Sequence, residues 1–281
     1  MSVRIMVAVH NGSPGTGTME LASNWADRLG GSVVGVGVVD GSGWARVVAT
    51  AGTPLTGVDA LEVRHKPMLA RAKEHVAQLL RQLEEHCRRA AVDYQQVQQT
   101  GAPQEQILLE AQRHDVILLG KQTTPDPGLG VPARSLLENV LRDSPRPVVA
   151  VPTRMEAGRG ILVAYDGSLQ AARALQALMA SGLTALGEVK VLSVDSESEE
   201  IAREHASRAA EYLAAHGLEA ETQPKVTDRS VHQVIVNEAR RQGAEMIVMG
   251  AYGRSRLAEI FLGSVSSRVI DESLVPVFLF H

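Results

Sequence analysis

The chain has 281 residues, of which 44% are hydrophobic and only 3% aromatic, so it can bury a sizeable core built from aliphatic side chains. Its formal net charge is −4 and it contains no long basic run, which argues against nucleic acid as a partner. No apolar run approaches the length of a membrane span, and the N-terminal apolar run is short and ends at His10, so we expect neither membrane insertion nor a signal peptide.

The chain reads as two copies of one unit. Near the start of each copy, Asn11 aligns with Asp166 at an offset of 155 residues (166 − 11). Near the end of each copy, Pro147 aligns with Pro276 at an offset of 129 residues (276 − 147). An internal repeat predicts two similar domains, and the shrinking offset indicates about 26 extra residues (155 − 129) in the first copy.

Within each copy, predicted strands alternate with predicted helices. Such alternation predicts a parallel sheet with helices on both faces and right-handed crossovers. The predicted fold class is therefore α/β, with two tandem Rossmann-like domains, each a five-stranded mainly parallel sheet. We place them at residues 1–153, called half one, and residues 158–281, called half two. The predicted strands are 4–10, 32–39, 92–98, 115–119 and 147–151 in half one, and 160–165, 188–194, 219–226, 245–249 and 275–280 in half two.

The clearest helix spans about residues 66–90, where apolar residues from Val76 to Ala90 recur on one face. The single cysteine of the chain, Cys87, lies on that stripe, so we expect a buried structural thiol. A lone cysteine forms no internal disulfide and is typical of the reducing cytosol, so a cytoplasmic location is expected.

Residues 40–60 have no counterpart in half two. This stretch is rich in glycine and threonine and has no clear period, which predicts a long surface loop. It would serve either as a spacer or as a lid or partner surface anchored by Trp44.

Near its end, half two contains the order strand, glycine loop, helix. An apolar run ending at Met249 predicts a buried strand, and the pattern Gly250-x2-Gly253-x9-Gly263-Ser264 follows it. A helix start leaves backbone N–H groups unpaired and carries partial positive charge, while glycines let an anion approach the backbone. Glycines after strands also mark ordinary tight turns, so the spacing alone leaves a phosphate site and a simple turn equally open.

Polar side chains near these glycines would complete an anion site. Ser264 could cap the helix or donate its hydroxyl to a phosphate, and Ser266 could add a second donor. Arg254 places a cation beside them. In the simpler reading, Ser264 is only an N-cap.

The glycine pattern resembles the nucleotide-binding pattern of the universal stress protein family, in its ATP-binding branch. A second match lies at Ile161 to Ser168, because the first strand in that family ends in an aspartate that faces the nucleotide, here Asp166. The family pattern covers the chain twice. The resemblance implies two adenine nucleotide alpha hydrolase-like domains whose fifth strands, Val148–Val151 and Val277–Phe280, meet in an intramolecular pseudo-dimer.

The resemblance also implies an ATP site, or one for ADP or AMP, in half two. Val194 would face adenine through its backbone, Asp166 would meet the ribose, and the glycine loop would hold the phosphates. Mg²⁺ would arrive with the nucleotide, held mainly by phosphate oxygens, with Asp166 as a candidate protein ligand and no built-in metal site. The implied nucleotide-binding residues are Ala164, Tyr165, Asp166, Gly167, Ser168, Val194, Met249, Gly250, Gly253, Arg254, Gly263, Ser264, Val265 and Ser266.

Half one departs from the family pattern at several positions. Asn11 replaces the strand-end aspartate, the equivalent of Gly253 is missing, and Arg134 stands where half two has Gly263. A side chain at Arg134 would obstruct a phosphate. Its guanidinium would either fill the vacated anion space or point to solvent, with half one acting as a scaffold.

No catalytic residue is predicted. The sequence lacks a Gly-x-Ser-x-Gly elbow and a His-Glu-x-x-His motif, and the scattered histidines, His205 among them, are expected at the surface or at helix ends. We find no general base placed to activate water, so slow ATP hydrolysis at most is expected.

The expected role is a nucleotide-dependent regulator of the stress response that acts through an unknown protein partner. A homodimer of whole chains stays open. One alternative is a slow ATPase or nucleotidyl-transferring enzyme that uses the same site. The other is a binding module for a ligand other than a nucleotide.

Overall fold

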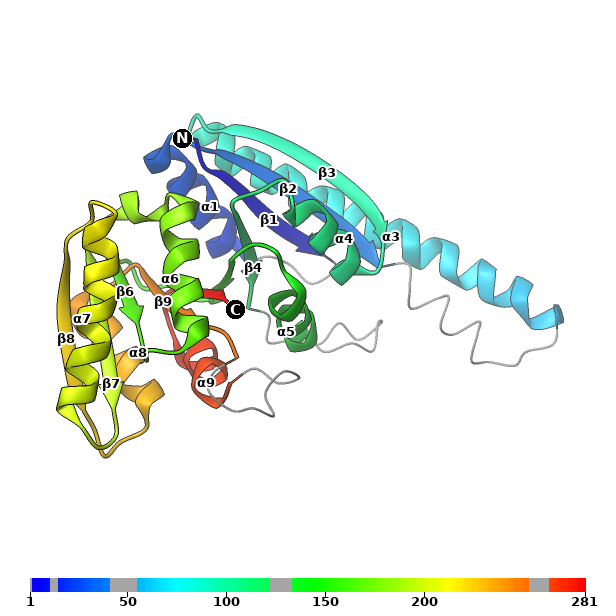
Figure 1. Cartoon of the computed structure of the whole chain (residues 1–281). Coiled ribbons are helices and arrows are strands. Elements are labelled where there is room, and N and C mark those ends of the chain that lie inside the picture. The colour runs from blue at the N-terminus through cyan, green and yellow to red at the C-terminus, as the bar shows by residue number, and fades with distance from the viewer. Residues whose placement is uncertain (1, 11–14, 41–54, 122–132, 253–262) are drawn as a thin grey trace.

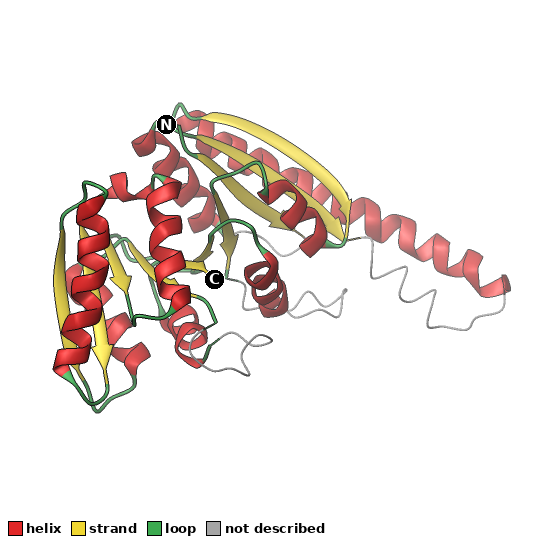
Figure 2. Cartoon of the chain, viewed as in Figure 1, coloured by secondary structure: helices red, strands yellow, loops and turns green. Residues whose placement is uncertain are grey.

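The computed structural model describes residues 2–10, 15–40, 55–121, 133–252 and 263–281; for residues 55–66 and 133–135 it describes the backbone only. Figures 1 and 2 show strands flanked by helices in both halves, which confirms the predicted α/β class. The elements of half one are β1 (Arg4–His10), α1 (Thr16–Leu29), β2 (Ser32–Asp40), α3 (Leu55–Arg89), β3 (Asp93–Gly101), α4 (Pro103–Ala111), β4 (Val116–Gly120), α5 (Ala133–Asp143) and β5 (Val148–Val151). Those of half two are β6 (Ile161–Ala164), α6 (Leu169–Ser181), the 3₁₀ helix η1 (Leu183–Leu186), β7 (Val189–Asp195), α7 (Glu199–Ala215), β8 (Ala220–Val226), α8 (Val231–Gln242), β9 (Met246–Gly250), α9 (Ser264–Glu272) and β10 (Val277–Phe280).

The strands form one continuous sheet across both halves. Its order is β3-β2-β1-β4-β5-β10-β9-β6-β7-β8, with ten strands in all. Every neighbouring pair is parallel except β5 and β10, which pair antiparallel with Phe278 opposite Val149. The expected meeting of the two fifth strands is therefore confirmed, and it joins the halves through backbone hydrogen bonds as well as side chains.

Alternate residues of the central strands face two separate cores. In β1, Ile5 and Val7 face the core that also contains residues of α1, α3, α6 and α7. Met6 and Ala8 face the opposite core, with residues of α4, α5, α8 and α9. Burial on both faces explains why these strands are nearly continuous apolar runs in the sequence. Of the helices that the structure describes, none is both long and apolar enough to cross a membrane.

Helix α3 begins earlier than the sequence predicted. It starts at Leu55, so the expected surface loop over residues 40–60 is wrong for residues 55–60. Pro67, a residue typical of a first helical turn, lies inside this helix. The rest of the insert, including Trp44, lies outside the described residues. Cys87 is fully buried on the inner face of α3, as expected.

The strand register corrects the alignment of the two halves by one residue. Met6 pairs with Ile117 in half one, and Leu162 pairs with Ile247 in half two. Ile117 and Ile247 pair in turn with equivalent residues of the fifth strands, which keep the offset of 129. The first strands are therefore related by an offset of 156 (162 − 6) rather than 155. The difference matters because a slip of one residue exchanges the two faces of a strand.

The corrected register makes His10, not Asn11, the residue of half one that is equivalent to Asp166. Asn11 itself lies outside the described residues. In either alignment, half one has no carboxylate at the end of its first strand.

Candidate functional site

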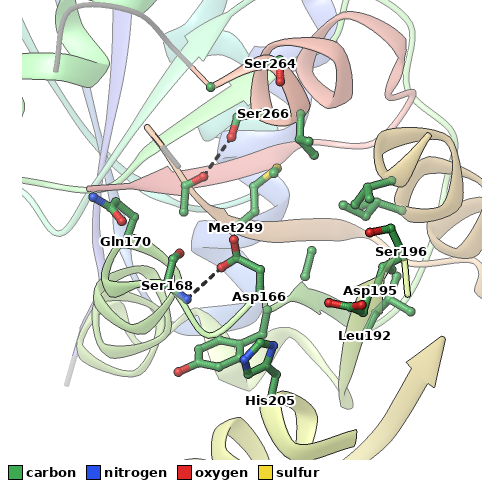
Figure 3. A pocket seen from close by; sticks show the side chains of 18 residues that line it. Asp166, Ser168, Gln170, Leu192, Asp195, Ser196, His205, Met249, Ser264 and Ser266 are labelled. Atoms are coloured by element: carbon green, nitrogen blue, oxygen red, sulfur yellow. Dashed lines mark hydrogen bonds between the residues drawn. The ribbon is translucent and has the colours of Figure 1, made fainter. Parts of the chain in front are cut away.

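A pocket of about 430 Å³ opens at the carboxyl ends of β6, β7 and β9 in half two (Figure 3). Ligands in open α/β sheets bind outside these ends, where the strand order reverses. Most of the predicted nucleotide-binding residues line it: Ala164, Tyr165, Asp166, Ser168, Val194, Met249, Gly250, Gly263, Ser264, Val265 and Ser266. Gly167 is not part of the lining, and Gly253 and Arg254 lie outside the described residues.

One side of the pocket is apolar. Leu192 and Val194 come from β7, Met249 from β9, and Val231 and Ile235 from the first turns of α8. The sequence prediction missed both α8 residues. The signal that would have found them is their spacing of four residues, which places them on one face of a helix start beside the strand ends.

A short turn fixes the carboxylate of Asp166. Its Oδ1 accepts a hydrogen bond of 3.0 Å from the backbone N–H of Ser168. Ser168 is the N-cap of α6, and its Oγ accepts a hydrogen bond of 3.2 Å from the N–H of Ala171. Two consecutive local bonds therefore hold the carboxylate at the end of β6, and Figure 3 shows it near the middle of the pocket.

Gly167 is explained by its conformation and by His205. Its φ of 74° is in the left-handed region that favours glycine, and a Cβ there would lie 2.6 Å from the His205 ring. His205 was expected at the surface or at a helix end; it lies instead in the middle of α7, where it is half-buried and lines the pocket. Nothing in the local sequence of α7 indicates this, because the contact joins segments far apart in the chain.

Gly250 also has a packing role. A Cβ at this position would lie 2.7 Å from the backbone N of Ala171 and from the backbone C of Gln170. The absence of a side chain therefore lets the first turn of α6 pack closely against the end of β9. This contact accounts for the glycine without any ligand.

The opposite end of the pocket is the start of α9. Gly263 is the N-cap and Ser264 the first helical residue, with no side-chain capping bond in the described structure, so of the two alternatives for Ser264 the structure excludes the N-cap. Ser266 is buried, and its Oγ donates a hydrogen bond of 3.0 Å to the carbonyl oxygen of Gly250. Its hydroxyl proton is therefore directed at the protein rather than at a ligand. The groups at this end that are chemically suited to an anion are the first backbone N–H groups of α9 and the exposed Ser264 hydroxyl.

Carboxylates dominate the side of the pocket formed by the ends of β6 and β7. Asp195 follows Val194, and its Oδ1 accepts hydrogen bonds from the N–H groups of Glu197 (2.8 Å) and Ser198 (2.9 Å). Burial raises the pKa of Tyr165, and the neighbouring Asp166 carboxylate raises it further, so the phenol stays neutral. In Figure 3, Asp166 and Asp195 are both well separated from Ser264.

Within the described ranges, no group of three or more metal-ligating side chains occurs. The side chain of Arg134 is not among those described, so its proposed place in the anion space stays a prediction.

Comparison with known proteins places these features in one family. A model described as the universal stress protein family matches residues 159–281. The universal stress protein YxiE of Bacillus subtilis is 31% identical over 144 residues, covering 42% of this chain and 96% of that protein. Universal stress protein Slr1230 of Synechocystis sp. is 26% identical over 168 residues, covering 59% of this chain and 58% of that protein, so the chain spans less than two thirds of this relative. A universal stress protein structure from Archaeoglobus fulgidus superposes with a TM-score of 0.68 at 20% identity, covering 98% of this chain and 95% of the other, which shows a shared fold.

Proposed function

Because the chain belongs to the universal stress protein family, we propose that half two binds an adenine nucleotide, with ATP as the expected ligand. The observation that carries this proposal is the pocket, in which an apolar wall, a fixed carboxylate and a helix start converge at the carboxyl ends of three strands. Its volume of about 430 Å³ falls in the range of about 300–1,000 Å³ typical of small-molecule sites.

The base would lie against the apolar wall beside β7. Strand β6 ends at Ala164, opposite Leu192, whereas β7 continues along β8 to Asp195. Within the described residues, the β7 backbone beyond Leu192 therefore has no strand partner on the β6 side. The backbone of Val194 would pair there with the polar edge of adenine, and Met249 and Ile235 would contact its faces.

The sugar and phosphates would extend from Asp166 toward α9. The Asp166 carboxylate is a suitable acceptor for ribose hydroxyls, and carboxylate hydrogen bonds are among the stronger ones. The N–H groups at the start of α9, with Gly263 and Ser264, would take the phosphates. Arg254 and Gly253 are proposed to contribute as the family pattern implies. Mg²⁺ would be held mainly by phosphate oxygens, with Asp166 as the candidate protein ligand.

The proposed role is regulatory: nucleotide binding would control how the chain engages a protein partner in a stress response. We assign no catalytic residue. The same proposal includes domains at residues 1–153 and 158–281 and a cytoplasmic location. Limited proteolysis that leaves two stable fragments with these boundaries would support the domain assignment.

The first experiment is to denature the freshly purified protein and identify what it releases, followed by calorimetric titration with ATP and Mg²⁺. About one adenine nucleotide per chain supports a single site in half two. Two per chain would show that half one also binds. If the protein releases none and the titration is silent, the proposed function is wrong. Repeated phosphate release over many turnovers would instead indicate an enzyme.

Two variants test whether the nucleotide binds in the pocket of half two. Asp166→Asn keeps the shape but removes the charge, so it should weaken binding by roughly tenfold or more, as expected for the loss of a charge-assisted hydrogen bond. Gly263→Arg copies the residue of half one and should abolish binding by blocking the phosphates. Glu221→Gln, on the exposed edge strand β8, is the matched control and should leave the affinity unchanged.

A further inference from the structure

A lysine from half one holds the far end of helix α9. Lys121 follows β4, and its Nζ donates hydrogen bonds to the backbone carbonyl oxygens of Asp271 (2.9 Å), Ser273 (3.4 Å) and Ile270. These carbonyls belong to the last turn of α9 and its C-cap, where helix carbonyls lack intrahelical partners and carry partial negative charge. The first turn of α9 forms the phosphate end of the pocket. An ammonium of half one therefore anchors the helix that the proposed ligand would contact.

A second contact between the halves lies just after β9, where the glycine loop begins. Tyr252 follows β9 by two residues and is 8% exposed. Its Oη donates a hydrogen bond of 2.9 Å to the carbonyl oxygen of Glu138 in α5 of half one. Its φ is 64°, and among the described non-glycine residues only Ala91 shares a positive φ. Such a backbone conformation costs free energy in a bulky residue and persists only where the surroundings hold it. The burial of the ring and its bond to α5 are what hold it here.

The two contacts are not copies of each other. In the strand register, Lys121 is equivalent to Ala251, and both backbone N–H groups donate to the fifth strand of their own half, at 2.6 Å and 2.8 Å. The backbone is thus repeated while the side chains differ, because alanine cannot reach the end of α5 as Lys121 reaches the end of α9. At this pair of equivalent positions, the side-chain contact therefore runs only from half one to α9 of half two.

We propose that half one positions the phosphate end of the half-two pocket, with Lys121 and Tyr252 as positioning residues. This inference rests on the proposed nucleotide function. Phosphate binding and the docking of α9 on half one would then favour each other, because each stabilises the same placement of the helix. Loss of either contact lowers the fraction of molecules in which the helix start is correctly placed, and the apparent affinity falls by that fraction.

The test compares two ligands, ATP and adenosine, by calorimetry. Lys121→Met and Tyr252→Phe should each weaken ATP binding by about threefold to tenfold, the range expected for one helix-end charge or one hydrogen bond. Adenosine has no phosphate, so its affinity should stay unchanged. Lys121→Arg keeps the cation and should restore ATP binding.

Matched controls separate positioning from general stability. Lys190→Met removes a lysine of β7 that pairs with Glu221, away from α9. Tyr94→Phe removes another phenol that donates to a helix carbonyl, that of Leu80 at 3.1 Å, inside half one. Neither should change the ratio of ATP affinity to adenosine affinity. Equal losses for both ligands in the Lys121 and Tyr252 variants, or no loss, would overturn the inference.

A measurement without ligand keeps the inference separate from the proposed function. Lys121→Met should speed hydrogen exchange in α9, where the N–H of Ser267 bonds to the carbonyl oxygen of Gly263 at 2.9 Å, and leave α6 unchanged. Unchanged exchange in α9 would refute the positioning role even if the wild-type protein bound ATP. Faster exchange in α9, together with a wild-type protein that binds neither ligand, would support the contact and refute the nucleotide function.

Discussion

Replacing Arg28 by methionine should lower the free energy of unfolding by about 2 kcal/mol, because it leaves a buried carboxylate without its cation. The Arg28 Nη1 lies 2.6 Å from Oε1 of Glu245, which also accepts a bond of 2.7 Å from the Trp25 indole N–H. Arg28 and Trp25 belong to α1 of half one, whereas Glu245 immediately precedes β9 of half two. The cluster therefore joins the halves at the amino end of β9, whereas the pocket lies at the carboxyl end of that strand.

The magnitude follows from the exposure of the two partners. The Glu245 side chain is 10% exposed, and its Oε2 has no hydrogen-bond partner within the described part of the chain. Breaking a fully buried pair costs about 3–5 kcal/mol, whereas an exposed pair is worth about 0–1 kcal/mol. The Arg28 side chain is 34% exposed, so water screens part of the pair and the expected loss lies between these limits.

Urea unfolding followed by far-ultraviolet circular dichroism measures the effect. Methionine keeps the apolar stem of Arg28, so the change isolates the guanidinium. The double variant Arg28→Met with Glu245→Gln should recover much of the loss, because no uncompensated charge remains. Arg203→Met, which breaks an exposed pair with Glu199, is the control and should cost about 0.5 kcal/mol or less. A loss for Arg28→Met no larger than this control would refute the reasoning.

Three further outcomes are expected. Gly250→Ala should destabilise the fold by about 1–3 kcal/mol in thermal unfolding, because its Cβ would meet the α6 backbone at 2.7 Å, whereas Gly15→Ala meets nothing within 4 Å and should cost less. Burial raises the pKa of Cys87 to about 11, so a thiol reagent at pH 8 should react only as the protein unfolds; rapid reaction of the native protein would contradict the buried site. Burial opposes the ionisation of Glu238, but hydrogen bonds from two basic side chains and an amide outweigh it and lower its pKa to about 2. Its contribution to stability should therefore be complete above about pH 4.5 and be lost as the pH falls through about 2, and Glu238→Gln should flatten this dependence in acid unfolding curves.

The central strands could be predicted because burial on both faces requires apolar residues, and these form recognisable runs in the sequence. Central strands such as β4 and β9 are buried on both faces, so each is an apolar run bounded by polar residues. The start of α3 could not be predicted, because residues 55–60 have no clear apolar period. The alignment of the first strands failed by one residue because both alignments match similar apolar residues, and only the pairing with β4 and β9 decides between them.

The candidate site was predictable only where it is continuous in sequence. The ends of β6 and β9 carry recognisable patterns, and these patterns do converge on one pocket. Ile235 reaches the pocket from α8, where only its spacing from Val231 could have indicated it, and His205 reaches the pocket from α7, where only the folded arrangement shows it. The glycines show a second limit of prediction from sequence, because one pattern fits both ligand binding and close packing. Gly167 and Gly250 match a pattern for ligand approach, yet their neighbours in the structure are a histidine ring and the backbone of α6.

The shared sheet explains how the two halves of one chain can differ in the side chains at their junction. The hydrogen bonds between β5 and β10 are formed by backbone groups, so the pairing does not require identical side chains on the two strands. Side chains that cross the junction are then not bound by symmetry. In a symmetric pair of identical chains, a lysine that anchors the partner's last helix would have to appear in both sites. In this chain, Lys121 of half one reaches the end of α9 in half two, whereas its equivalent Ala251 has no side chain long enough for the reverse contact, so the junction is asymmetric at this position.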